Sequence, residues 1–175
     1  MRKSDMIELG LTIPLQRHLK IKTLPYGQEP DRRFCWDLHV IPLRSRSSLL
    51  AVHCHTRYTF VLYDLSRWEW EHLPDVFLNG LRRSLSNAGF STESAEVFCG
   101  LKASLLTKTH GRREVAFLNR AWEDVMAAEL ALDENGQNQP LLDQIVNAKP
   151  SRCVGFDGLG TAAERICHDL GKSDL

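Results

Sequence analysis

Three histidines and one aspartate have the spacing in this sequence that most suggests chemistry. His53 and His55 lie two positions apart in a strand-like segment, so both side chains emerge on one face. If the loop before that strand has three residues, His39 lies opposite His53 and Asp37 opposite His55. Three imidazoles and a carboxylate would then suit a zinc or iron site, or a general acid–base pair. A shift of one residue in the register places Val52 opposite His39 and breaks up the group.

The ordinary alternative is that these histidines line a partly solvated sheet face and bond to backbone or water. We favour this interpretation and expect neither a metal ion nor a cofactor. The five cysteines are scattered, odd in number and without C-x-x-C spacing, which argues against a structural zinc site. They predict free thiols and a cytoplasmic location.

A second group of candidates is basic and belongs to a predicted helix. Arg112 and Arg113 precede this helix and Arg120 lies within it, so the three side chains are candidates for contacting phosphate. Arg120 and Asp124 are four residues apart, however, a spacing typical of a solvated helix face. Lys plus Arg and Asp plus Glu both number 22, so the formal net charge is zero. Without long-range attraction to phosphate, nucleic-acid binding is left open but not favoured.

Two further features have a functional and a purely structural interpretation. Trp68 and Trp70 share one side of an extended segment and would form an exposed interaction patch, unless they pack under the next helix. Gly155, Gly158 and Gly160 precede a helix with a capping box, and such a turn can hold phosphate. Neither nucleotide-binding fingerprint is present, so a flexible turn is the favoured interpretation.

The candidate residues are positioned by a predicted antiparallel meander. The connections between its strands are too short to join anything but antiparallel neighbours. Both faces of these strands are substantially apolar, which predicts that helices cover them. We therefore expect an α+β fold with an antiparallel β-meander sheet covered by helices. The meander strands are predicted at residues 35–43, 48–54 and 58–65, and two other strands at 6–12 and 104–107.

The rest of the chain is predicted to be mainly helical. Apolar stripes at helical spacing predict helices over residues 74–88, 92–99 and 113–131. A polar break follows, and it predicts two parts: an α+β domain of residues 1–131, and a helical C-terminal extension within residues 132–175. The extension is expected to dock on the domain or on a partner.

Composition and the chain start fit this organisation. Hydrophobic residues make up 43% and charged residues 25% of the 175 residues, as in ordinary globular proteins. The N-terminal segment does not resemble a signal peptide, and no apolar run is long enough to span a bilayer. The sequence therefore predicts no association with a membrane.

Several short motifs carry a resemblance to a known family. They include Trp36, the run Leu49-Leu50-Ala51-Val52-His53, and the run Leu118-Asn119-Arg120-Ala121-Trp122-Glu123-Asp124. Over residues 6–130 the sequence resembles an uncharacterised prokaryotic family recorded only as a domain of unknown function. The resemblance implies no activity, cofactor or catalytic residue.

The leading expectation is a non-enzymatic protein-binding or regulatory module with a protein partner. Its surface would include the C-terminal helices or the two-tryptophan segment. The alternative is a small hydrolase-like, metal-dependent enzyme that uses the histidine cluster and Asp37. A nucleic-acid-binding protein that uses the three arginines comes third, and homodimerisation is left open.

Overall fold

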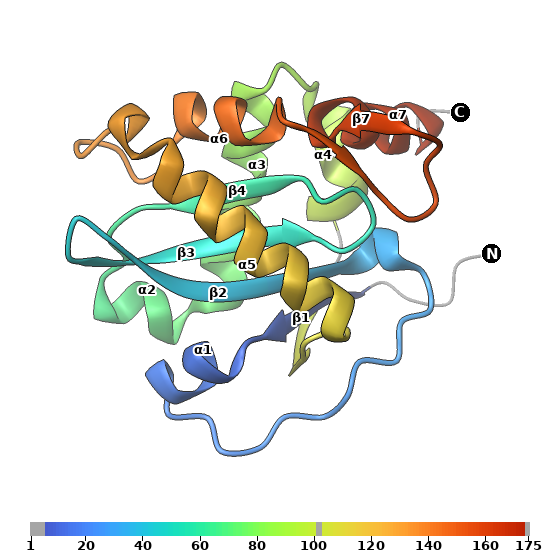
Figure 1. The fold of residues 1–175 in the computed structure, drawn as a ribbon. Coiled ribbons are helices and arrows are strands. Elements are labelled where there is room, and N and C mark those ends of the chain that lie inside the picture. Colours follow the sequence, from blue (N-terminus) through green and yellow to red (C-terminus); the bar gives the residue numbers. More distant parts are fainter. Residues whose placement is uncertain (1–5, 101–102, 174–175) are drawn as a thin grey trace.

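The centre of the molecule is a five-stranded sheet of order β4-β3-β2-β1-β5 (Figure 1). It is seen in a computed structural model that describes residues 6–100 and 103–173. The two strands β6 and β7 form a separate antiparallel ribbon. The strands are β1 (Met6–Leu11), β2 (Cys35–Leu43), β3 (Arg46–His53), β4 (Thr59–Leu62), β5 (Ala103–Lys108), β6 (Pro150–Arg152) and β7 (Leu159–Thr161).

The predicted meander is correct for three strands, but the sheet as a whole is mixed. Strands β2, β3 and β4 pair antiparallel, whereas β1 pairs parallel with both β2 and β5. Parallel neighbours need long crossover connections, and local spacing does not reveal which strands such connections bring together. The fold is therefore α+β with a mixed sheet, rather than with a purely antiparallel one.

Helices cover both faces of this sheet. In Figure 1, α5 crosses the front face, and α3 and α4 lie behind the sheet. No helix in the described ranges is both long enough and apolar enough to cross a bilayer. The helices are α1 (Ile13–His18), α2 (Arg67–Glu71), α3 (Leu73–Asn87), α4 (Thr92–Cys99), α5 (Arg112–Ala127), α6 (Pro140–Asn147) and α7 (Ala162–Ser173), with 3₁₀ turns at Arg32–Phe34 and Glu129–Ala131.

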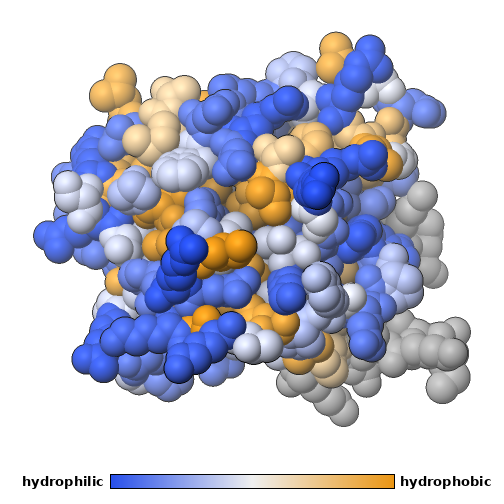
Figure 2. All heavy atoms as spheres, turned by 60° about the horizontal axis from the view of Figure 1, so that its bottom comes forward, coloured by the Kyte–Doolittle hydropathy of each residue, from blue (hydrophilic) through white to orange (hydrophobic). Residues whose placement is uncertain are grey.

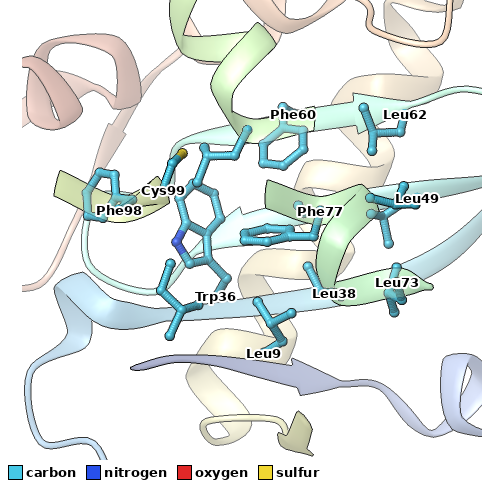
Figure 3. Packing of buried hydrophobic residues seen from close by; sticks show 14 of the residues in the cluster. Leu9, Trp36, Leu38, Leu49, Phe60, Leu62, Leu73, Phe77, Phe98 and Cys99 are labelled. Carbon is cyan, nitrogen blue, oxygen red and sulfur yellow. The ribbon is translucent and has the colours of Figure 1, made fainter. Parts of the chain in front are cut away.

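The core behind the sheet is organised around Trp36. Its indole is fully buried and lies edge-on to three aromatic rings, as Figure 3 shows. The ring centroids are 5.7 Å away for Phe60, 5.4 Å for Phe77 and 6.2 Å for Phe98. Edge-to-face pairs at these separations add to the stabilisation that comes from burial alone.

A second core lies between the sheet and helices α5 and α6. Leu50 and Val52 of β3 pack there with Leu118 of α5 and with Leu142 and Val146 of α6. Two residues of α7 belong instead to the core on the other side of the sheet, Ile166 and Leu170. Residues beyond 131 thus contribute to both cores, and the independent folding of residues 1–131 stays a prediction.

Helix α6 also completes the exposed edge of the sheet. The Asn147 side chain accepts a hydrogen bond from the Thr59 N–H (2.8 Å) and donates one to the Thr59 carbonyl (2.7 Å). Asp143 accepts from the Val61 N–H at 3.1 Å. Unpaired edge strands invite pairing with other chains, and polar side chains of α6 take the place of that missing strand.

We predict that Asn147→Ala lowers the free energy of unfolding by about 1–3 kcal/mol, because it leaves buried backbone groups of Thr59 without partners. Urea unfolding measures the loss. The matched control is Gln144→Ala on the exposed face of the same helix, which should change stability by less than about 0.5 kcal/mol. Equal effects of the two substitutions would show that α6 does not serve the edge strand in this way.

Candidate functional site

The turn between β2 and β3 is shorter than the sequence analysis expected. Arg44 and Ser45 form a two-residue turn with positive φ angles of 45° and 66°, and Leu43 pairs with Arg46. Two residues in the left-handed region are typical of the type I′ turn, whose twist matches that of a hairpin. The three-residue loop expected from the sequence would pair His39 with His53. The observed turn pairs each residue of β2 with a β3 residue three positions earlier than that expectation. An odd shift moves side chains to the opposite face of the sheet.

The histidine cluster therefore does not form, and the prediction that His39 and His53 are neighbours is wrong. His39 lies opposite Leu50, and His53 lies opposite Trp36. The two imidazoles project from opposite faces of the sheet, and each has its own set of partners.

His39 faces helix α5. Its Nδ1 is 2.6 Å from the Thr12 hydroxyl, and its ring lies edge-on to Trp122 with centroids 5.1 Å apart. Burial lowers the pKa of His39 below its ordinary value. The side chain is a neutral, hydrogen-bonded part of the core on this face.

His53 is fully buried on the other face of the sheet. Its Nε2 is 2.9 Å from the Arg33 carbonyl, and its Nδ1 is 2.7 Å from the Thr56 hydroxyl. A carbonyl only accepts, so Nε2 carries the hydrogen and Nδ1 accepts from Thr56. Burial lowers the pKa of His53 to about 4.

His55 and Asp37 also separate. His55 Nδ1 lies 2.5 Å from an Asp169 carboxylate oxygen of α7, and its ring packs against Phe156 at 5.0 Å. Asp37 is buried elsewhere, with Oδ1 2.6 Å from Nδ1 of His110. Only His53 and His55 stay near each other, with ring centroids 6.3 Å apart, so the expected cluster is divided among three places.

The partners of Asp37 form a buried cluster that the sequence analysis missed. His110 lies between two carboxylates, because its Nε2 is 2.9 Å from an oxygen of Glu8. Side-chain exposure is 2% for His110 and Asp37 and 6% for Glu8. The thiols of Cys35 and Cys54 flank the group at 3.9 Å from Glu8 and 3.7 Å from His110. These residues come from β1, β2, the end of β3 and the β5–α5 loop, so no local spacing announces them.

Charge within this cluster is strongly coupled. Burial alone favours a neutral His110 ring, but hydrogen bonds, that to Asp37 foremost, hold the pKa of His110 well above its ordinary value. Burial likewise disfavours the Glu8 carboxylate, but hydrogen bonds from His110 and from two backbone N–H groups leave its pKa lowered. The cluster therefore holds ionised groups away from solvent.

The two tryptophans lie on opposite sides of α2 because the segment is helical rather than extended. Trp68 is 62% exposed, whereas Trp70 is 7% exposed. On the face shown in Figure 2, apolar residues form small groups between hydrophilic ones. The glycine turn lies between β6 and α7, where Gly155 and Gly158 have positive φ angles.

The basic candidates divide between the surface and a cavity. Arg112 and Arg113 are exposed at the start of α5, and Arg120 lines a cavity of about 210 Å³. This cavity lies between α5, the connection from α6 to β6, and the start of α7. It is lined by four cationic side chains and one carboxylate: Arg57, Arg120, Lys149, Arg165 and Asp124. Arg57 was not among the residues singled out from the sequence.

Arg57 is the residue of this cavity with the most unusual environment. It lies in the turn between β3 and β4 with φ 67° and is only 7% exposed. Its guanidinium stacks over Phe117 at 4.0 Å from the ring centroid, and Nη2 is 3.7 Å from a Glu114 oxygen. Among the described residues, Nε and Nη1 have no hydrogen-bond partner. Buried guanidinium nitrogens are normally paired, so two open donors are exceptional.

Arg165 holds the wall of the cavity together. The residue is 4% exposed, and its guanidinium donates to the carbonyl oxygens of Thr56, Ser151 and Gly160. These bonds join the β3–β4 turn to both strands of the small ribbon. Burial, with a contribution from the positive charge of Arg57, lowers the pKa of Arg165 below its ordinary value. Both guanidinium groups line the same cavity.

The remaining cations lie nearer to solvent. Lys149 Nζ is 2.8 Å from an Asp124 oxygen, and the Arg120 guanidinium lies 5.5 Å from the Phe117 centroid. Partly exposed ion pairs of this kind contribute little to stability. The cavity thus combines the buried charges of Arg57 and Arg165 with the more exposed charges of Lys149 and Arg120.

A family model matches most of this chain. The family model described as "Domain of unknown function (DUF6933)" covers residues 8–161. The chain belongs to this family. A search of the curated proteins finds no match.

The DUF6933 match includes most of both groups of residues described above. Glu8, Asp37 and His110 lie within it, as do Arg57 and Lys149. It also runs through the polar break at residues 133–139 that the sequence analysis took as a domain boundary. Arg165 lies beyond the match, at the part of α7 that closes the cavity.

For this DUF6933 domain we predict a loss of stability between about pH 6.5 and pH 4 that originates at His53. The unfolded histidine binds a proton near pH 6.5, whereas the folded one does so only near pH 4. In this window the unfolded state binds more protons, so stability rises with pH by up to about 1.4 kcal/mol per unit. Urea unfolding at several pH values should show a shallower slope for His53→Gln than for the unsubstituted protein.

The control for this measurement is His72→Gln, because His72 is an exposed histidine. Its slope should match that of the unsubstituted protein. If His53→Gln keeps the full slope, His53 is not the group that titrates.

Proposed function

We propose that this chain is a non-enzymatic binding module whose cavity holds a small ligand through a phosphate group. The observation that carries the proposal is the buried Arg57 guanidinium, two of whose nitrogens have no partner in the described part of the chain. A buried cation without an adequate counterion is strongly unfavourable. Phosphate oxygens match the fork of N–H groups that arginine presents, so an oxyanion at Arg57 would satisfy both charge and geometry.

The charge around Arg57 supports an anion rather than a neutral ligand. Four cations and one carboxylate line the cavity, although the whole chain has a formal net charge of zero. The nearby Glu114 is 3.7 Å from Nη2, longer than a good charge-assisted hydrogen bond. Ala162 at the start of α7 also lines the cavity, and the N-terminal end of a helix favours negative charge.

Cavity size restricts the ligand. Sites for drug-sized molecules occupy roughly 300–1,000 Å³. The present cavity of about 210 Å³ is smaller, so it suits inorganic phosphate or the phosphoryl end of a small metabolite. Phe117 lines the same cavity, and its ring stacks against the Arg57 guanidinium.

The proposal keeps the class of function expected from the sequence, a non-enzymatic binding module, and adds a small ligand to it. The hydrolase alternative loses its basis, because His39 and His53 face opposite sides of the sheet. Nucleic acid stays the third candidate: Arg113 lies seven residues before Arg120, so both project from one side of α5. A protein partner, homodimerisation and a cytoplasmic location stay predictions.

The test is calorimetric titration with inorganic phosphate at constant ionic strength, with thermal unfolding as a second readout. Phosphate should raise Tm more than chloride does, since a ligand that binds only the folded state stabilises it. Arg57→Met should weaken phosphate binding by roughly 10- to 150-fold, the loss expected for one charge-assisted contact. Arg120→Met removes a cation at the cavity opening and should weaken binding less.

The matched control is Arg67→Met, because the Arg67 side chain is 93% exposed on α2, away from the cavity. It should bind phosphate like the unsubstituted protein. Phosphate affinity that is unchanged in Arg57→Met, or no difference between phosphate and chloride, would refute the proposal. If Arg57→Met fails to fold, the comparison of Arg120→Met with Arg67→Met decides. Equal phosphate affinities of these two variants would then refute the proposal.

A further inference from the structure

We infer that Glu8, Cys35 and His110 form a buried site for a divalent metal ion, with zinc the best match to the ligand set. This inference is independent of the proposed phosphate site. One carboxylate oxygen, one thiol sulfur and one imidazole nitrogen lie within 4.8 Å of one another. His110 Nε2 lies 2.9 Å and Cys35 Sγ 3.9 Å from Glu8 Oε2, so each pair can reach one ion at typical zinc bond lengths of about 2.0–2.3 Å.

Two of the three ligands, His110 and Glu8, are held in place by second interactions. Asp37 Oδ1 is 2.6 Å from His110 Nδ1, which directs the opposite nitrogen, Nε2, toward Glu8. A carboxylate on the far nitrogen of a histidine is the usual way in which proteins orient a metal-binding imidazole. The other Glu8 oxygen, Oε1, accepts the backbone N–H groups of Gln28 and Glu29 at 2.6 and 2.8 Å. Oε2 is thereby left for the ion.

Two glycines show how closely the backbone surrounds these groups. A Cβ atom on Gly27 would lie 2.3 Å from Glu8 Oε2 and 3.0 Å from His110 Nε2. On Gly10 it would lie 2.1 Å from Asp37 Oδ1. Real Cβ atoms do not approach other atoms this closely, so larger residues at either position would displace the ligand groups.

The charge balance of the cluster also favours a cation. Two carboxylates, Glu8 and Asp37, face a single imidazole in a site that solvent hardly reaches. Net charge in such surroundings is strongly unfavourable. A mixed set of thiolate, imidazole and carboxylate suits zinc better than magnesium or calcium, which prefer oxygen ligands alone.

His110 offers a second triad through its other nitrogen, with Asp37 and Cys54. The first triad is the better site because Asp37 is already occupied. It accepts the main-chain N–H of His110 at 3.2 Å in addition to the ring nitrogen. An ion bound by the preferred ligands would fasten the connection between α1 and β2, which contains Gln28 and Glu29, to the sheet.

The experiment measures metal content and cobalt spectra on the full chain after removal of any affinity tag. We expect about one zinc ion per chain after exposure to Zn²⁺ and removal of excess, and a lower Tm after chelation. Cobalt substitution should give a thiolate-to-cobalt absorption band. Cys35→Ser should abolish this band, and His110→Ala should abolish stoichiometric binding.

Cys99→Ser is the matched control, because Cys99 is a buried thiol on α4 outside the cluster. It should keep the zinc and the cobalt band. A chain that takes up no zinc, shows no cobalt band and melts identically with chelator would overturn the inference. Loss of the band in Cys54→Ser but not in Cys35→Ser would overturn this ligand set. The measurements on the unsubstituted protein decide the matter even if a variant fails to fold.

Discussion

The structure depends above all on the register of the β2–β3 hairpin. A two-residue turn at Arg44 and Ser45 places Trp36 beside His53 on one face, and Asp37 with Val52 on the other. The first face then carries the aromatic core, and the second carries the buried acid–histidine cluster and the packing against α5. Because a shift by an odd number of residues exchanges the two faces of β3 relative to β2, one extra turn residue would take His53 away from Trp36 and turn it to the opposite face.

A second constraint is the position of β1 between β2 and β5. Its parallel pairing places Glu8 beside Cys35 and Leu105, and Gly10 beside Asp37 and Thr107. Since β5 leads through His110 directly into α5, the imidazole returns over these strands at the point where Gly10 leaves room. The cluster is thus a product of strand order. Four segments of the chain supply it, and the small size of Gly10 and Gly27 admits the ring and the covering loop.

Local patterns predicted the elements well, because alternation and apolar stripes record which face of each element is buried. They predicted the meander strands, the long helices and the strands beside residues 6 and 104. They did not predict the parallel pairing of β1, since crossover connections leave no signature in spacing. For the same reason, Glu8 and Arg57 were not identified from the sequence as candidate site residues. Trp68 and Trp70 were misread for another reason: the Ser66–Glu69 capping box starts a helix, which turns the two rings apart.

The two proposed sites are neighbours along the same pair of segments. Cys54 lies 3.7 Å from His110, and three residues further on Arg57 lies 3.7 Å from Glu114. The turn that follows β3 is therefore attached twice to the start of α5, once at the metal cluster and once at the cavity. An ion held by His110 would fix the start of α5 and hence Glu114, the only carboxylate that contacts Arg57 among the described ion pairs. An oxyanion at Arg57 would in turn order the turn that carries Cys54. If one ligand changes the affinity for the other through this connection, linkage requires the change to be reciprocal.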